Sequence, residues 1–108
     1  MLSNKQLVLS KTAEESSELA KECLKGQLYG TASAYNGVLN EELIREEALD
    51  TLVCIRRLEL AGVIRYISDA DVSAHYQSKL DKIKRRTAMA IEANQLEPAA
   101  YGLIPERV

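Results

Sequence analysis

Residues 40–61 read NEELIREEALDTLVCIRRLELA, and this stretch decides the fold. It contains neither Gly nor Pro, so no residue within it interrupts a helix. Asn40 is a suitable N-cap, and Gly62 follows as a C-terminal stop signal. Glu41 and Glu42 stand in the first turn, where negative charge favours the helix dipole. We therefore predict a helix over residues 40–61.

Apolar side chains cover a wide arc of this predicted helix. On a helical wheel they flank an acidic face formed by Glu47 and Asp50, with Leu49, Val53 and Leu60 on one side and Ile44, Ala48, Ile55 and Leu58 on the other. A helix with so wide an apolar arc has to be covered on more than one side. We expect a second subunit to cover part of it. The alternative is a central helix in a monomer.

Two further helices are expected on either side of this one. Residues 4–25 contain neither Gly nor Pro, and Gly26 is their expected stop. Ser68 or Asp69 begins a helix that reaches about Asn94, with apolar side chains at helical spacing. Between the first two helices, the glycines and small residues of the stretch 26–39 indicate a loop.

The sequence thus predicts an all-α fold, a helical bundle with three main helices per chain that oligomerisation completes. A helical domain is expected over residues 1–94, followed by an extended C-terminal tail over residues 95–108, which contains Pro98, Gly102 and Pro105. The chain has five Tyr but neither Phe nor Trp, so its core has to be mainly aliphatic, which suits helices.

Composition argues against several classes of protein. The formal net charge of −2 is not that of a dedicated nucleic-acid binder. No stretch approaches the roughly 20 apolar residues of a membrane span, and residues 1–25 lack the apolar run of a signal peptide. Cys23 and Cys54 have no CxxC spacing and are expected to be small buried apolar residues. We expect a cytoplasmic protein with neither nucleic acid nor membrane as a partner.

Two acidic motifs carry the chemistry. They are Glu14-Glu15-Ser16-Ser17-Glu18 in the first helix and Glu47-Ala48-Leu49-Asp50 in the second. Carboxylates three residues apart project from one helix face. On a helical wheel these faces also carry apolar residues, where carboxylates are costly to bury alone. Each motif by itself is commonly a solvated helix face.

Hard divalent cations prefer oxygen ligands, and two helices packed side by side offer four of them. We therefore predict that Glu15, Glu18, Glu47 and Asp50 bind Mg²⁺, with Mn²⁺ as the alternative. Glu22, one turn further along, is an accessory candidate. In the absence of metal the carboxylates should repel one another, which would raise their pKa values.

The order Glu-Glu-x-x-Glu, a spacer over residues 19–46 and Glu-x-x-Asp resembles the MazG-like all-α nucleoside triphosphate pyrophosphohydrolases. The segment Lys25-Gly26-Gln27-Leu28-Tyr29-Gly30 is similar to one after the first helix of small phage and integron members. A Lys-x-x-Lys-Ile segment over residues 79–83 is similar too, and the resemblance spans roughly residues 7–91. Several relatives carry a basic residue where Leu28 stands, which leaves the part of this loop in substrate binding open.

The resemblance implies a Mg²⁺-dependent enzyme that cleaves NTP or dNTP between the α and β phosphates, releasing NMP and pyrophosphate. It implies that Glu15, Glu18, Glu47 and Asp50 are the catalytic metal ligands. The implied assembly is a homodimer or homotetramer in which helices of neighbouring subunits pack together. One alternative is a non-catalytic regulatory or interaction protein of the same fold. Another is a structural bundle with solvated acidic residues.

Basic and aromatic side chains are available to bind such a substrate. The basic candidates are Lys25 at the end of the first helix and Lys79, Lys82 and Arg86 on the third. Each of them is equally suited to lie over apolar surface with its charge in water. Tyr29 and Tyr35 are candidates to stack on a base, although a loop Tyr is more often a packing residue.

Overall fold

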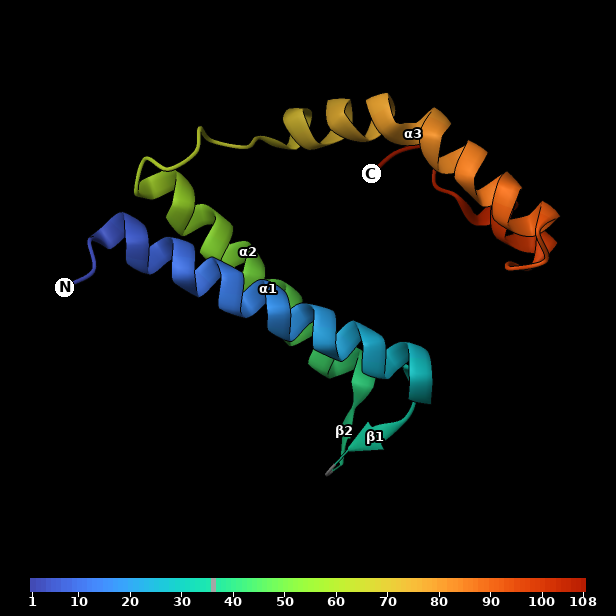
Figure 1. Ribbon diagram of the computed structural model, residues 1–108, viewed down its shortest axis with the longest axis horizontal. Coiled ribbons are helices and arrows are strands. Elements are labelled where there is room, and N and C mark those ends of the chain that lie inside the picture. The colour runs from blue at the N-terminus through green and yellow to red at the C-terminus, as the bar shows by residue number, and fades with distance from the viewer. Residues whose placement is uncertain (36) are drawn as a thin grey trace. The chain divides into compact units, whose positions relative to one another are not determined.

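The computed structural model describes residues 1–35 and 37–108, except the side chain of Tyr35, and these residues are mostly helical (Figure 1). The helices are α1 (Asn4–Tyr29), α2 (Asn40–Leu60), α3 (Asp69–Glu92) and the short 3₁₀ helix η1 (Pro98–Leu103). The strands β1 (Ala34–Tyr35) and β2 (Val38–Leu39) have two residues each. The predicted all-α class is confirmed. No helix in the described part of the chain is long and apolar enough to cross a membrane.

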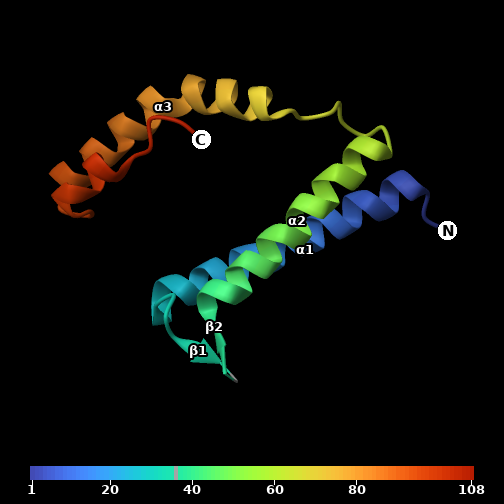
Figure 2. The ribbon, with the colours of Figure 1, turned by 180° about the vertical axis from the view of Figure 1, so that it is seen from behind.

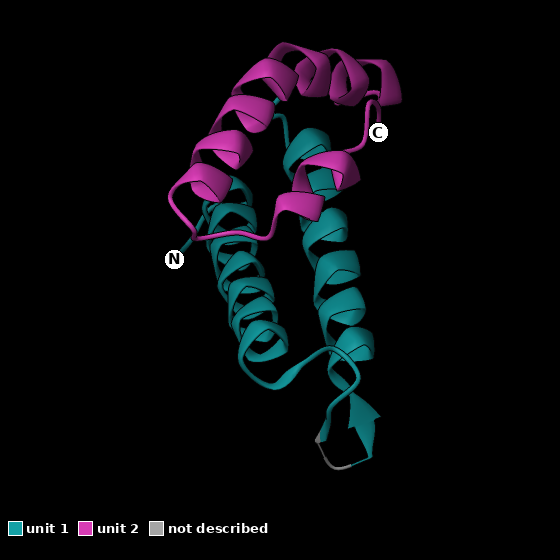
Figure 3. Ribbon diagram, turned by 90° about the vertical axis from the view of Figure 1, so that its right-hand side faces the viewer, with its two compact units in different colours: residues 1–66 teal, residues 67–108 magenta. Residues whose placement is uncertain are grey.

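The chain divides into two compact units, which Figure 3 colours separately. The first unit, Met1–Tyr66, contains α1, the strand pair and α2. The second unit, Ile67–Val108, contains α3 and η1.

Helices α1 and α2 lie side by side along much of their length (Figures 1 and 2). Gly26 is buried in α1 at their contact, where an added Cβ would lie 2.9 Å from Cδ1 of Ile44. The prediction that Gly26 ends the first helix is therefore wrong. Its missing side chain allows α2 to approach closely, and α1 continues for another turn.

The first helix ends instead at Gly30, whose φ of 86° and ψ of 149° lie in a region that side chains disfavour. Asn40 then fixes the start of α2, because its buried Nδ2 donates a 3.0 Å hydrogen bond to the carbonyl of Gly30. Leu39, not Asn40, is the N-cap, so the predicted capping role of Asn40 is wrong. Its side chain connects two helices rather than capping one.

A short antiparallel strand pair joins the two helices, where a loop was expected. Ala34 pairs with Leu39, and Tyr35 pairs with Val38. The Asn36-Gly37 dipeptide in the sequence is a known hairpin signal, and it could have indicated this pair. The hairpin returns the chain directly to the α1–α2 contact.

The second unit is built around α3, whose N-terminus has the capping box formed by Ser68 and Asp71. Of the two predicted starts, Ser68 and Asp69, Ser68 is the cap. The tail was expected to be extended, but it forms η1 and then returns along α3. Gln77 Nε2 donates to the Glu106 carbonyl at 2.6 Å, and Lys84 forms a 3.0 Å ion pair with the Glu106 carboxylate. These contacts make the tail part of the unit.

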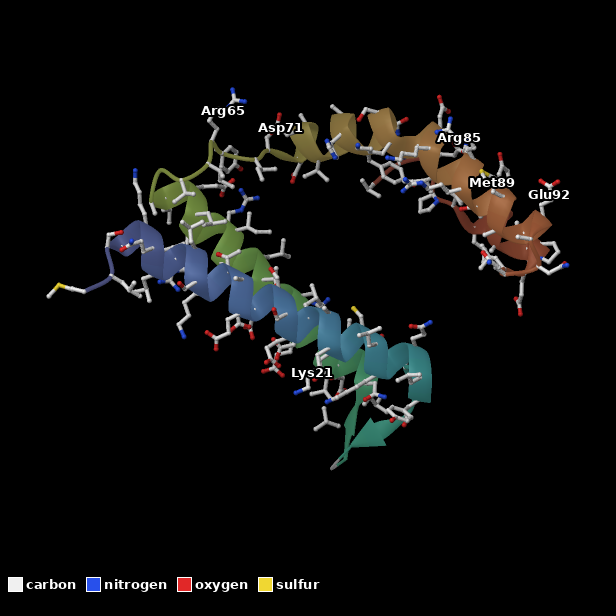
Figure 4. The ribbon with its side chains drawn as sticks, viewed as in Figure 1. Lys21, Arg65, Asp71, Arg85, Met89 and Glu92 are labelled. Atoms are coloured by element: carbon white, nitrogen blue, oxygen red, sulfur yellow. The ribbon has the colours of Figure 1, made fainter. Side chains whose placement is uncertain are left out.

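One side of α3 faces solvent. Arg85, Met89 and Glu92 are exposed at a spacing of four and three residues, and they project from this side (Figure 4). Leu80 is the buried apolar residue of this helix. The core of the second unit is therefore thin.

The conformation of Gly30 yields a stability prediction. Gly30→Ala should lower the free energy of unfolding by about 1–3 kcal/mol, because Ala is strained at this φ and ψ. Chemical denaturation followed by circular dichroism measures the change. Gly102→Ala is the control, since its added Cβ meets no atom within 4 Å and its φ is not positive. Equal stability of Gly30→Ala and the native chain would contradict the prediction.

Candidate metal centre

Three carboxylates meet where α1 packs against α2. Glu15 comes from α1, and Glu47 and Asp50 come from α2. One oxygen of each lies within 4.8 Å of the others. The three-residue spacing places Glu47 and Asp50 on one face, as the sequence predicted. The packing of the two helices then brings Glu15 against that face.

Thr51 links the two helices at this group. Its Oγ1 lies 2.8 Å from the carbonyl oxygen of Glu47, within α2, and 3.3 Å from that of Glu15, on α1. The single hydroxyl proton is therefore aimed at two carbonyls, one from each helix. Sequence reasoning missed Thr51. Its place directly after the acidic motif, before the apolar run Leu52-Val53-Cys54-Ile55, is the signal that could have found it.

The surroundings of Glu47 disfavour the ionised form of its carboxyl group. Its Oε2 is buried and has no hydrogen-bond partner among the described residues. Burial is the largest of the causes that raise the pKa of Glu47, followed by its hydrogen bond with Glu15 and the charges of Glu15, Asp50 and Glu18.

The predicted rise in pKa is thus confirmed at Glu47, although burial, and not the repulsion by any one carboxylate, is its largest single cause. A buried carboxylate oxygen without a donor fits a divalent cation, which would compensate its charge. The group also opens to a cavity of about 260 Å³, lined by Glu15, Asp50, Val53 and Cys54. A small hydrated cation or a phosphate oxygen can enter such a space.

The remaining acidic residues of α1 have different surroundings. Glu18 is half-buried and lies outside the group of three, but its charge reaches Glu47. Glu14 is exposed and forms a 3.2 Å ion pair with Lys11. Glu22 is buried, and its Oε1 accepts a 3.2 Å hydrogen bond from Lys25.

The predicted substrate-binding residues fall into two groups. Lys25 and Tyr29 lie in the last two turns of α1 and line one cavity. Lys79, Lys82 and Arg86 are exposed on α3, in the second unit, where Lys79 also lines a groove with His75 and Tyr76. The side chain of Tyr35 lies outside the described residues.

Comparison with known proteins found no matching family model, no matching curated protein and no matching solved structure. Membership of the MazG-like family therefore stays a prediction from the sequence motifs.

The raised pKa of Glu47 predicts a pH-dependent effect on stability. Without divalent metal, Glu47→Gln should melt at a higher temperature than the native chain near pH 7, because ionised Glu47 destabilises the folded state. As the pH rises from the unfolded pKa to the higher folded pKa, the native chain loses stability that the variant keeps. The advantage should vanish well below the ordinary glutamate pKa of about 4.3, where Glu47 is protonated in both states.

Thermal melts in chelator at both pH values measure this difference. Glu14→Gln is the matched control, because Glu14 is an exposed glutamate paired with Lys11, and its removal should give no gain. A Glu47→Gln variant that melts at or below the native temperature near pH 7 would refute the prediction.

Proposed function

We propose that this chain is a Mg²⁺-dependent nucleotide pyrophosphohydrolase that cleaves NTP or dNTP to NMP and pyrophosphate. The observation that carries the proposal is the convergence of Glu15, Glu47 and Asp50, which includes a buried carboxylate oxygen without a donor. The MazG-like order of the acidic motifs supports the choice of reaction. An acidic group of this kind has no evident value for stability in the absence of a cation.

The carboxylates Glu15, Glu47 and Asp50 would hold the metal, and their hard oxygen atoms suit Mg²⁺ or Mn²⁺. When bound, the metal polarises the phosphoryl oxygens and lowers the pKa of a coordinated water. Thr51 would keep the two helices, and so the ligands, in register. The site depends on this register because its ligands come from both helices.

Hydrolysis requires a water oxygen to attack the α phosphorus as the bond to the α–β bridging oxygen breaks. Pyrophosphate then leaves with that oxygen, and the water gives up a proton. Glu18 is the candidate to orient the water or accept its proton, because it lies next to the group of three without belonging to it. Its other candidate role is that of a fourth metal ligand, as the resemblance implies.

The negative phosphates also require positive charge. Lys25 is the candidate on α1, and Lys79, Lys82 and Arg86 are further candidates on α3. Each is proposed to act on substrate affinity rather than on the chemical step.

We propose further that the active form is a homodimer or homotetramer. Large apolar side chains remain exposed on α2, including Leu52 at 55% and Leu60 at 88% exposure. Scattered exposed apolar residues are common, but a row of them on a long helix is typical of an interface. Val53, which lines the cavity at the acidic group, is also exposed. A second subunit would then border the site.

Catalysis is tested by removing one metal ligand. Glu47→Gln or Asp50→Asn should lower kcat by about 10²–10³-fold, because charge developing in the transition state loses its stabilisation. Chromatography or phosphorus NMR identifies the products, which should be NMP and pyrophosphate and should form only with Mg²⁺ or Mn²⁺. Glu14→Gln is again the control and should retain full activity.

Other results would lead to different conclusions. Release of inorganic phosphate and a nucleoside diphosphate would reject the proposed cleavage. A metal-dependent rise in Tm without turnover of any nucleotide would favour the non-catalytic alternative. For Glu18→Gln, loss of rate with unchanged metal affinity assigns the water-orienting role, whereas weakened metal affinity assigns a ligand role.

The assembly is tested with charges on the exposed face of α2. Leu52→Glu combined with Leu60→Glu should convert the oligomer to a chain of 12.0 kDa in light scattering, because buried charge disrupts an apolar interface. Lys5→Glu, at an exposed position of α1, changes the net charge equally and should leave the assembly intact. A native chain that is monomeric at micromolar concentration would refute the assembly.

A further inference from the structure

Residues 104–108, which we call the return segment, run back along α3 (Figures 1 and 2). Helix α3 holds this segment mainly by its backbone. Three side chains of α3 each donate a hydrogen bond to one main-chain oxygen of the segment, Ser73 to Val108, Tyr76 to Pro105 and Gln77 to Glu106. Every extended chain presents main-chain oxygens, so these contacts do not depend on the sequence that is held.

One further contact selects a side chain. Lys84 Nζ forms a 3.0 Å ion pair with the carboxylate of Glu106. The Lys84 side chain is 29% exposed, whereas that of Glu106 is 75% exposed. The ammonium group therefore has a partly covered position on α3, where it favours a segment that brings a negative charge.

An apolar groove of about 630 Å³ lies beside the return segment. Its lining includes Ile67, Val72, Tyr76 and Ile83 of the same unit, and Val108 is the residue of the return segment that borders it. Val108 is 61% exposed and Val72 is 48% exposed. The return segment thus leaves apolar lining of the groove open to water.

We infer that α3 is a docking surface for an extended peptide of a partner protein, and that the return segment occupies this surface as a built-in competitor. The peptide has an acidic residue, which pairs with Lys84, and two positions later a large apolar residue, which enters the groove at the place of Val108. Its main-chain oxygens accept the hydrogen bonds of Ser73, Tyr76 and Gln77. Peptide recognition commonly takes affinity from main-chain hydrogen bonds and specificity from side-chain pockets.

A partner peptide needs an advantage over the return segment, because the segment is tethered. A short tether gives an effective concentration on the order of millimolar. The unfilled groove supplies the advantage. Replacing the small side chain of Val108 by a larger apolar one buries more surface, at about 25 cal/mol per Å². The expected partner therefore carries a residue such as Phe or Leu at this position.

The experiment uses the full-length chain, isotopically labelled, and two peptides with blocked ends, Ile-Pro-Glu-Arg-Val and Ile-Pro-Glu-Arg-Phe. The first has the sequence of the return segment. Glu106→Lys replaces the attraction to Lys84 by repulsion and should release the segment from α3. Glu92→Lys is the matched control, because it makes the same change of charge at an exposed residue on the solvent side of α3 (Figure 4).

Titrations followed by NMR should shift the amide signals of Ser73, Tyr76 and Gln77. Both peptides should bind Glu106→Lys at least about tenfold more tightly than the native chain or Glu92→Lys, because the competitor is weakened. The Phe peptide should bind about tenfold more tightly than the Val peptide, because it fills more of the groove. Lys84→Glu should reverse the charge preference, binding Ile-Pro-Lys-Arg-Phe and losing the Glu peptide.

Equal affinity for the Glu and Lys peptides, or shifts confined to residues outside α3, would overturn the docking surface. If Glu106→Lys loses helical circular dichroism, the native chain decides. There an excess of the Phe peptide should shift Ser73 and displace Val108, and an unmoved Val108 signal would overturn the inference. If the signals of Ser73 and Val108 instead change with the concentration of the native chain alone, a second copy supplies the segment, which overturns the assignment to a partner protein.

Discussion

The packing of α1 against α2 is the contact on which the candidate site depends. It places Glu15 against the face that carries Glu47 and Asp50, so no single helix contains the group. The contact is stabilised at points along its length, by the Thr51 hydroxyl at the acidic group and by the close approach of α2 at Gly26. At the hairpin end, the buried Asn40 side chain connects the start of α2 to Gly30.

This contact brings like charges together, which is unfavourable for folding. The raised pKa of Glu47 expresses that cost, since burial and neighbouring carboxylates both disfavour its ionised form. Carboxylates with shifted pKa values are typical of functional sites, although structural ion-pair networks also contain them. The local conflict between charge and burial is therefore the physical basis of the proposed metal site, which a cation would relieve.

The same packing explains why the chain has so little core. The buried apolar residues among those described are Val8, Cys54 and Leu80, while Leu52 and Leu60 of α2 stay exposed. Two long helices in one layer bury only the faces that meet. The proposed assembly would cover the remaining apolar face and would also border the cavity at the acidic group.

Local sequence determined the helices, because apolar periodicity and caps such as Ser68 act over a few residues. The spacing of Glu47 and Asp50 likewise fixed their common face. Tertiary packing decided the rest. The sequence predicts a helix stop at Gly26, but this residue lies against Ile44 within α1. The sequence predicts a cap at Asn40, but its side chain donates a hydrogen bond to the carbonyl of Gly30. The meeting of Glu15 with Glu47 and the bridging role of Thr51 depend on the register between helices, which distant contacts set and local periodicity cannot.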